Sequence, residues 1–394
     1  MLDMDIIITL MVLLSSALIL GSIADKFGIP KVVAYIIAGM LLGHIASGLL
    51  SYGSELSGIS EVSLFFIMLM VGIEATTELL TKHIRSAVMF TISSFIIPVA
   101  IMIAVSVFAF GLDPTQALVT SMAIGVPSIS IISVLVMRYD LLRIDDGARM
   151  VSSVVLTDVI AFAALAAIGA STVPVYVVVL SILAFVLALL FFDGVLRHNA
   201  ASIRRLFIKE YNERHGEELI FAGVILIGLV GAALLQLAGI TYVLGAFFAG
   251  LLIHDAVVGK RVYGILQRTF RRITNSFFIP VFFSIAGLQV AMPSDYLELM
   301  IVLVAISGAV GGALDYIVGL NRLKELGPMT AVALLGSRGA VGIIIADIAL
   351  LGGVISINLY SIIILGTVVL SLILPVMLGG EGRLADAQHE KNKN

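Results

Sequence analysis

The 394-residue sequence contains no cysteine and few charged residues. Without cysteine the chain has no disulfide bonds, thiolate metal sites or cysteine nucleophiles. Its six histidines are scattered and lack the spacing of a zinc motif, so we expect no zinc site. Charged residues make up only 12% of the chain and hydrophobic residues 60%, a balance that excludes a soluble domain of this length. The composition therefore predicts an all-α integral membrane protein.

Thirteen apolar runs are long enough to cross the hydrocarbon core of a bilayer, although short connections leave twelve as an alternative. They lie at residues 4–22, 31–50, 61–77, 86–110, 114–137, 147–170, 173–192, 217–238, 240–256, 275–291, 297–319, 328–350 and 357–378. The first run lacks a basic leader and a small-residue cleavage pattern, so we expect it to be retained as a helix.

The distribution of Lys and Arg tests this count, because basic residues concentrate in cytoplasmic loops. Every second connection between the runs contains Lys or Arg, and the connections in between contain none. This alternation predicts about thirteen transmembrane helices in the cell membrane, with the N-terminus outside and a polar cytoplasmic tail at 379–394. All but one of the 23 basic residues fit the pattern, and the exception, Arg338, lies inside the twelfth run.

Two of the runs contain residues that interrupt a helix. The fifth run includes Gly125-Val126-Pro127-Ser128, and the twelfth includes Gly336-Ser337-Arg338-Gly339. Such breaks free backbone groups that lipid cannot satisfy, although a simple kink is the alternative for either one. Because the fifth and twelfth runs cross in opposite directions, runs 4–6 and 11–13 are expected to form inverted repeats with two broken crossing helices.

Asp158 is the carboxylate most closely associated with these breaks. It lies in the apolar run SSVVLTDVIAFAAL at 152–165, and an ionisable group inside the membrane marks a functional site by default. The alternative is a structural carboxylate neutralised by a basic partner. We expect Asp158 to stand near the positive ends of the broken helices and to exchange a proton for a cation, while Arg338 compensates the negative ends.

A hard cation such as Na⁺ or K⁺ prefers oxygen ligands. Candidate ligands beside Asp158 are the hydroxyls of Thr157, Ser128 and Ser130 and the carbonyl of Val126. Ser and Thr in membrane helices more often donate to their own i−4 carbonyl, which is the competing role for each hydroxyl.

Three further carboxylates lie in or near apolar runs. Glu74, at the cytoplasmic end of the third run, is either a solvated end charge or part of a cation funnel. Asp315 is expected near the cytoplasmic end of its run, where water is reachable, and Asp347 toward the outer face. Asp347 follows Arg338 by nine residues, about 13 Å along a helix, so the two do not pair directly.

The sequence resembles the monovalent cation:proton antiporter-2 family, which includes bacterial and archaeal Na⁺/H⁺ and K⁺/H⁺ exchangers. Six segments in order support the resemblance: KFGIPKVVAYIIAGMLLG at 26–43, FFIMLMVGIEATTELL at 65–80, SVVLTDVIAF at 153–162, YVLGAFFAGLLI at 242–253, FFIPVFFSIAGLQV at 277–290 and GSRGAVGIIIADIAL at 336–350.

This resemblance implies a homodimer with elevator-like alternating access. Residues 1–77 and 217–291 would form the dimerisation part, 173–192 a linker helix, and 86–170 with 297–378 the ion-translocating core. Asp158 matches the ion- and proton-carrying Asp of the family, and Ser128 matches the hydroxyl at the break of the crossed helix.

The sequence departs from the family in three places. Thr157 stands where relatives have Asp, Asn or Gln, and a single acid at this pair favours electroneutral one-for-one exchange. Ala309 lies near the position where many relatives carry Lys. Ala340 replaces the Glu that is common after Arg-Gly, which leaves the acidic partner of Arg338 open.

Together these features predict a secondary-active antiporter that exchanges protons for Na⁺ or K⁺ and uses no cofactor beyond the transported ions. Its expected partners are a second copy of the chain and the lipid bilayer, and not nucleic acid. A cation channel or a proton-coupled solute carrier on the same scaffold is the alternative. An intramembrane enzyme would need a second catalytic carboxylate or a Ser/His or metal set, and the sequence suggests none.

Overall fold

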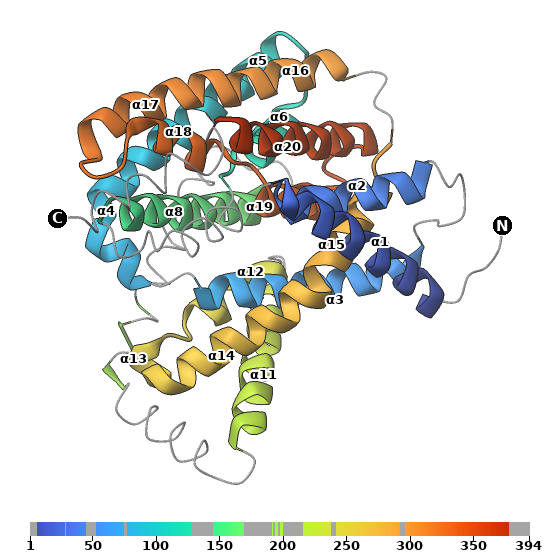
Figure 1. Cartoon of the computed structure of the whole chain (residues 1–394), viewed down its shortest axis with the longest axis vertical. Helices are drawn as coiled ribbons and strands as arrows, with labels where there is room; N and C mark the ends of the chain where they lie inside the picture. Colours follow the sequence, from blue (N-terminus) through green and yellow to red (C-terminus); the bar gives the residue numbers. More distant parts are fainter. Residues whose placement is uncertain are drawn as a thin grey trace. The chain divides into compact units, whose positions relative to one another are not determined.

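The computed structural model describes residues 6–27, 29–44, 53–74, 77–127, 145–168, 191, 194–195, 198–199, 216–237, 242–291 and 296–377. Within these ranges every regular element is a helix, and the only β feature is one isolated bridge between Pro127 and Arg338 (Figure 1). The predicted all-α class is therefore confirmed.

Six described helices are long and apolar enough to cross a membrane, namely Ile6–Lys26, Ser54–Glu74, His83–Phe108, Asp145–Leu165, Gly216–Leu237 and Leu297–Arg322. Shorter apolar helices lie at Lys31–Gly43, Ala340–Leu351 and Ile357–Leu372. Each of these nine coincides with a predicted run, as expected for a multi-pass membrane protein. All of the predicted run 173–192 except residue 191, and most of the second half of run 114–137, lie outside the described residues.

Internal contacts divide the chain into two compact units, Met1–Tyr52 with Glu78–Ala161 and Phe283–Asn394, and Gly53–Thr77 with Phe162–Phe282. The helices that fall mainly in the first unit are α1 (Ile6–Lys26), α2 (Lys31–His44), α4 (Thr77–Thr91), η1 (Ile92–Ile96), α5 (Ile97–Phe108), α6 (Pro114–Gly125), α8 (Asp145–Ile168), α15 (Ile279–Leu288), α16 (Leu297–Ala305), η4 (Ile306–Val310), α17 (Gly311–Arg322), α18 (Pro328–Gly336), α19 (Ala340–Leu351) and α20 (Ile357–Met377). The predicted dimerisation part and moving core concern assembly and motion, so that division stays a prediction.

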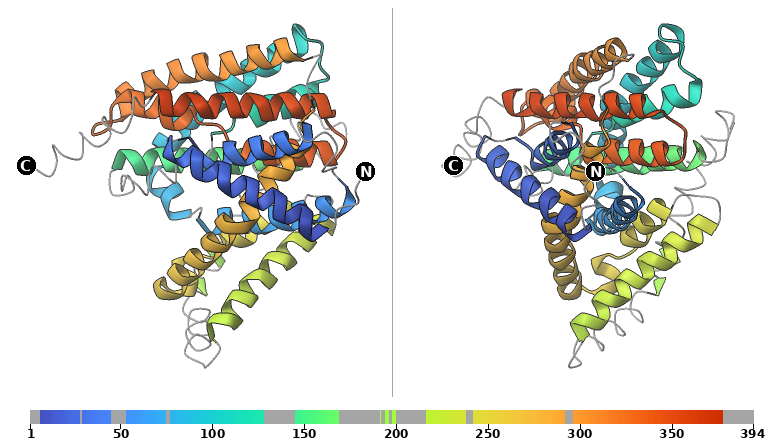
Figure 2. Two further views of the ribbon diagram at one scale, coloured as in Figure 1. Left: turned by 45° about the vertical axis from the view of Figure 1, so that its right-hand side comes forward. Right: turned by 90° about the vertical axis from the view of Figure 1, so that its right-hand side faces the viewer.

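In the first unit, two long helical rods each contain a π-helical turn. One rod is α4, η1 and α5, and the other is α16, η4 and α17. The turn η1 packs against α17 and α6, whereas η4 packs against α5. Helices α16 and α17 form one long orange rod in Figure 1, and Figure 2 shows the same rod from two further sides. A π-helical turn widens the backbone hydrogen-bonding pattern locally and is common at functional sites. The two turns thus lie where the two rods contact each other.

The crossing of α6 and α19 is close because Gly342 has no side chain. A Cβ at Gly342 would overlap the carbonyl oxygen of Ala123 on α6. Since Ala123 lies two residues before the end of α6 and Gly342 two residues after the start of α19, this contact brings one end of each helix together.

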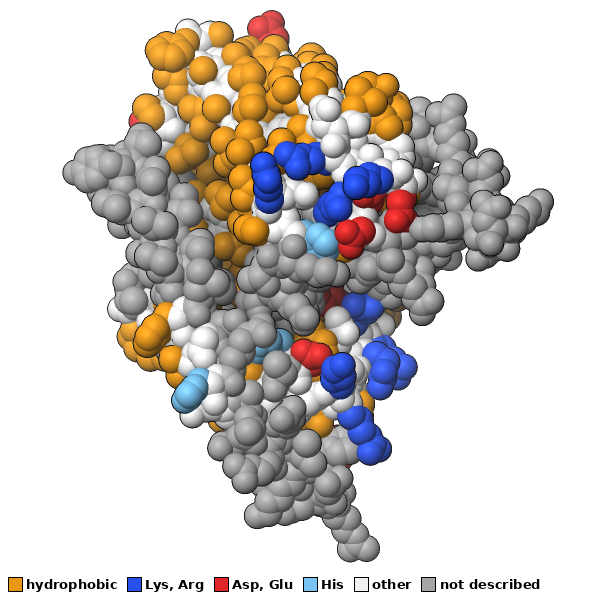
Figure 3. Space-filling model, turned by 90° about the vertical axis from the view of Figure 1, so that its left-hand side faces the viewer, with side chains coloured by type: hydrophobic (Ala, Val, Ile, Leu, Met, Phe, Trp, Pro, Cys, Tyr) orange, Lys and Arg blue, Asp and Glu red, His pale blue; other side chains and the backbone are white. Residues whose placement is uncertain are grey.

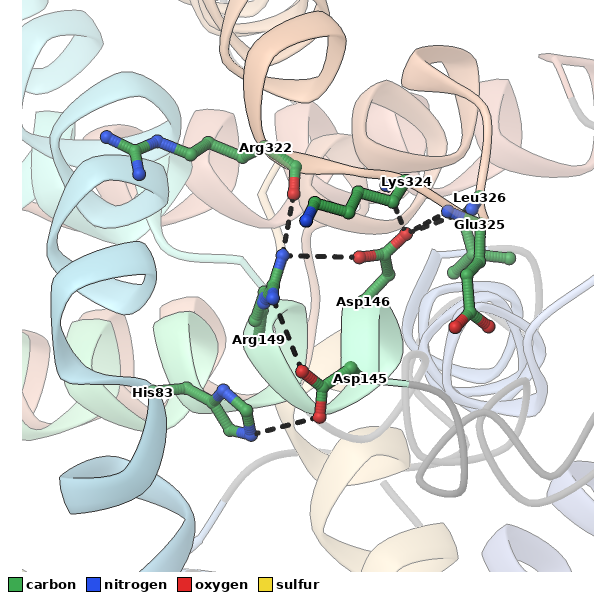
Figure 4. A network of polar contacts seen from close by, with 8 residues as sticks. All are labelled: His83, Asp145, Asp146, Arg149, Arg322, Lys324, Glu325 and Leu326. Carbon is green, nitrogen blue, oxygen red and sulfur yellow. Dashed lines mark hydrogen bonds and ion pairs between the residues drawn. The ribbon is translucent and has the colours of Figure 1, made fainter.

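A polar network fastens the start of α8 to the connection between α17 and α18 (Figure 4). The buried Asp146 carboxylate accepts hydrogen bonds from the backbone N–H groups of Lys324, Glu325 and Leu326 at 2.7, 2.6 and 3.0 Å. Arg149 Nη1 donates to the carbonyl of Arg322 at 2.8 Å.

Weaker contacts extend this network outward. Arg149 approaches Asp146 at 3.4 Å and Asp145 at 3.3 Å, and His83 Nε2 lies 3.9 Å from Asp145. Figure 3 shows Lys and Arg side chains gathered with acidic and His side chains, beside a hydrophobic surface. The network holds the helix that carries Asp158 by its first turn.

The second unit contains α3 (Ser54–Glu74), α11 (Gly216–Leu237), α12 (Tyr242–Leu251), α13 (Asp255–Val258), α14 (Lys260–Ile273) and η3 (Thr274–Phe278). Helix α12 packs between α3 and α11. Helix α14 is amphipathic: it buries Val262, Leu266 and Phe270, which recur every four residues, while its basic residues lie on other faces.

Candidate functional site

Both predicted helix breaks are present in the first unit. Helix α6 ends at Gly125, and Val126 continues in an extended conformation. Helix α18 ends at Gly336, and Ser337 is extended before α19 begins at Ala340. The isolated antiparallel bridge joins Pro127 in one break to Arg338 in the other. The prediction of two broken helices that meet is therefore confirmed, whereas Ser128 and Ser130 lie outside the described residues.

Asp158 is buried on α8 with 1% of its surface exposed. Neither of its carboxylate oxygens has a hydrogen-bond partner in the part of the chain that the structure describes. An unpaired buried carboxylate is costly, because the lost hydration is not replaced. A structural carboxylate would need a basic partner, and none is found for Asp158 among these residues. A proton or a cation can supply the missing partner.

Thr157 participates in a small group of hydroxyls next to Asp158. Its Oγ1 donates to the carbonyl of Ser153 at 2.8 Å and lies 3.3 Å from Oγ1 of Thr91 on α4. Thr91 Oγ1 also donates to the Ser153 carbonyl, at 3.1 Å. Thr157 thus makes the i−4 hydrogen bond of the competing role, but a hydroxyl oxygen that donates its proton still has lone pairs for a cation.

Arg338 is 1% exposed, and its guanidinium donates to three oxygens. Nη1 bonds the Leu335 carbonyl at 2.6 Å, Nη2 the Ser94 carbonyl at 3.2 Å, and Nε the Ser307 hydroxyl at 3.1 Å. The Arg338 carbonyl in turn accepts from the Ser371 hydroxyl. Leu335 belongs to the last turn of α18, so the guanidinium lies at the negative end of this half-helix, a geometry that fits charge compensation.

The prediction that water reaches Asp315 was wrong, because this residue has 0% of its surface exposed. Helix α17 approaches its neighbours closely through glycines: a Cβ on Gly312 would lie 3.3 Å from Val332, and one on Gly319 would lie 3.0 Å from Pro328. The tight packing of α17 against α18 excludes water. Asp315 Oδ1 instead accepts a hydrogen bond from Ser93 Oγ at 2.7 Å.

Glu74 belongs to the second unit, where its Oε1 accepts from Arg271 Nε at 2.7 Å. The ion pair accounts for this partly buried carboxylate, and the funnel role stays a prediction. Asp347 is buried on α19, with Gln289 Nε2 3.5 Å from its Oδ1.

The structure brings some of the predicted residues together. Pro127, next to Val126, meets Arg338, and Thr157 lies beside Asp158 on α8. Asp158 and Arg338 do not pair directly. Sequence reasoning missed Thr91, Ser93, Ser94 and Ser307, which are small polar residues in apolar runs. Their only signal was the presence of hydroxyl groups in FTISSFII at 90–97 and VAISGAV at 304–310.

Comparison with known proteins identifies many relatives at low identity. A "Na(+)/H(+) antiporter" of Enterococcus hirae is 25% identical over 388 residues, which cover 95% of this chain and 97% of that protein. The "Na(+)/H(+)-K(+) antiporter GerN" of Bacillus cereus is 24% identical over 93% of this chain and 94% of its own length.

The fold also matches a solved structure. The sodium proton antiporter MjNhaP1 from Methanocaldococcus jannaschii at pH 8 superposes with a TM-score of 0.69 and 16% sequence identity, covering 95% of this chain and 96% of that chain. At this identity the likeness shows a shared fold.

The family model described as "Sodium/hydrogen exchanger, transmembrane" matches residues 12–380. Its members are transporters, in agreement with the predicted absence of enzymatic activity, and the narrower antiporter-2 group stays a prediction. Because the match covers nearly the whole 394-residue sequence, the chain belongs to the transmembrane sodium/hydrogen exchanger family.

Proposed function

We propose that the protein is a secondary-active antiporter that exchanges protons for Na⁺ or K⁺ at Asp158. The observation that carries this proposal is a fully buried carboxylate without a hydrogen-bond partner among the described residues, in the same compact unit as the two helix breaks. The relatives named as Na⁺/H⁺ antiporters support sodium, and the one named as a Na⁺/H⁺-K⁺ antiporter keeps potassium open.

Asp158 binds either a proton or a cation, and the two compete for the same carboxylate. With a cation bound, oxygens complete its coordination: the Thr157 hydroxyl, the Val126 carbonyl, and Ser128 and Ser130, which follow the break in sequence. Arg338 stays charged and occupies the carbonyl end of α18, so that the cation is not drawn to that end.

A single competing carboxylate makes the exchange electroneutral. The site carries one positive charge in each direction, a proton one way and a monovalent cation the other. Since Thr157 contributes no second charge, the transported charge is the same in both half-cycles and the membrane potential does not drive net flux.

We place this exchange in a homodimer in the cell membrane, with the N-terminus outside and the C-terminus cytoplasmic. The core at 86–170 and 297–378 moves in an elevator-like manner against the dimerisation part at 1–77 and 217–291. The inverted orientation of the two broken helices supports alternating access, because such repeats form mirror-related pathways.

Purified protein in sealed vesicles with an internal pH dye tests the proposal. A pulse of Na⁺, K⁺ or Li⁺ is expected to move protons outward from wild type when the membrane potential is clamped at zero, and Asp158→Asn is expected to abolish the signal. Asp25→Asn, at an exposed residue near the end of α1, is the matched control and keeps it. Proton movement that persists in Asp158→Asn contradicts the proposal, and current without proton movement indicates a channel.

A further inference from the structure

Besides Asp158, the first unit buries two residues of opposite charge, Arg338 and Asp315. The Arg338 guanidinium donates to three neutral oxygens, two carbonyls and one hydroxyl. Within the described residues no carboxylate lies at ion-pair distance from it. Neutral acceptors satisfy the hydrogen bonds of the guanidinium but do not neutralise its positive charge, and a buried charge without a counter-charge is costly.

Helix α17 brings Asp315 toward this charge. A Cβ on Gly311 would lie 3.7 Å from Arg338 Nη2, so the guanidinium rests against this point of α17. Asp315 follows four residues later on the same helical face, about 6 Å along the axis. Arg338 and Asp315 are therefore close enough to interact electrostatically without direct contact.

The π-helical turn η1 connects the two residues from the other side. The Ser94 carbonyl accepts from Arg338 Nη2 at 3.2 Å, and the adjacent Ser93 hydroxyl donates to Asp315 Oδ1 at 2.7 Å. Asp315 Oδ2 has no hydrogen-bond partner among the described residues. Two neighbouring serines thus hold both members of the pair, and nothing on the described chain other than Arg338 balances the charge of Asp315.

We propose that Asp315 is the counter-charge and positioning residue of Arg338. The inference rests on the proposed function for its effect on transport, but not for its effect on stability. With Asp315 ionised, the Arg338–Asp315 pair is neutral overall and does not repel a cation that enters the Asp158 site.

Loss of the Asp315 charge is expected to act on cation affinity and not on turnover. In Asp315→Asn, Arg338 becomes an uncompensated positive charge in the core. The half-saturating Na⁺ concentration is expected to rise roughly tenfold, the effect of one uncompensated positive charge on cation binding, with the maximal rate retained. Asp315→Glu keeps the charge and is expected to restore the affinity.

A double-mutant cycle on thermal unfolding tests the pair without transport. Asp315→Asn and Arg338→Gln are each expected to lower the melting temperature, and the double variant is expected to lose less than the sum. Asp347→Asn, at a buried carboxylate of α19 that lies near Gln289, is the control and should combine additively with Arg338→Gln.

Additive losses for Asp315→Asn with Arg338→Gln overturn the inference, as does an unchanged half-saturating concentration in Asp315→Asn. If Asp315→Asn alone fails to fold, recovery of folded protein in the double variant supports the pair, and failure of the double variant while Arg338→Gln folds overturns it. A wild type that moves no ions contradicts the proposed function, whereas the unfolding cycle still decides the pair.

Discussion

At the scale of single residues, the Thr157 hydroxyl makes hydrogen-bonding contacts and is also a proposed ligand of the cation. Its Oγ1 donates to the Ser153 carbonyl and lies close to Oγ1 of Thr91. Thr157→Val keeps the shape and removes the oxygen. We expect the half-saturating Na⁺ concentration to rise about three- to tenfold, the cost of one lost polar contact.

Thr157→Ser is the matched control for this prediction, because it retains the hydroxyl and removes only a methyl group. Exchange measured in vesicles should then remain close to wild type. An equal rise in the half-saturating Na⁺ concentration in the Val and Ser variants would mean that packing, and not the hydroxyl oxygen, sets the Na⁺ affinity.

Also at this scale, some of the site follows from sequence and some does not. Asp158 and Arg338 could be singled out as candidates because each is a charged residue inside an apolar run. Ser93, Ser94, Ser307 and Asp315 could not be assigned, since their partners lie 31 to 244 residues away in the chain and only the packing of helices brings them together.

At the scale of elements, the breaks after Gly125 and Gly336 were predictable from their Gly, Pro and Ser residues, and the structure confirms both. The π-helical turns η1 and η4 were not, because one extra residue per turn leaves no mark on the apolar pattern. The same turns supply Ser93, Ser94 and Ser307, so missing them concealed the surroundings of Arg338.

The first turn of α8 provides a prediction at this scale. Asp146→Ala removes the acceptor of three backbone N–H groups in the α17–α18 connection. We expect a loss of about 3 kcal/mol in unfolding free energy, together with faster amide hydrogen exchange at residues 324–326. Asp145→Ala, whose side chain is 56% exposed, serves as the control and should cost less than about 1 kcal/mol. Unchanged exchange at 324–326 in Asp146→Ala would contradict this role.

At the scale of the whole molecule, the cysteine-free sequence makes the predicted orientation directly testable. Ser356, between α19 and α20, is exposed and falls in a connection predicted to face outward, whereas Lys324 is exposed in a connection predicted to be cytoplasmic. A membrane-impermeant maleimide applied to intact cells is expected to label Ser356→Cys and to reach Lys324→Cys only after permeabilisation. The opposite pattern would invert the orientation, and the unlabelled wild type is the control.

The attachment of Asp146 to the α17–α18 connection also has a kinetic consequence. A motion that pulled α8 away from that connection would break three hydrogen bonds to one carboxylate together. At about 1.5 kcal/mol each, the barrier would rise enough to slow such a motion by more than a thousandfold. Helix α8, which carries Asp158, and the α17–α18 connection are therefore expected to move as one piece.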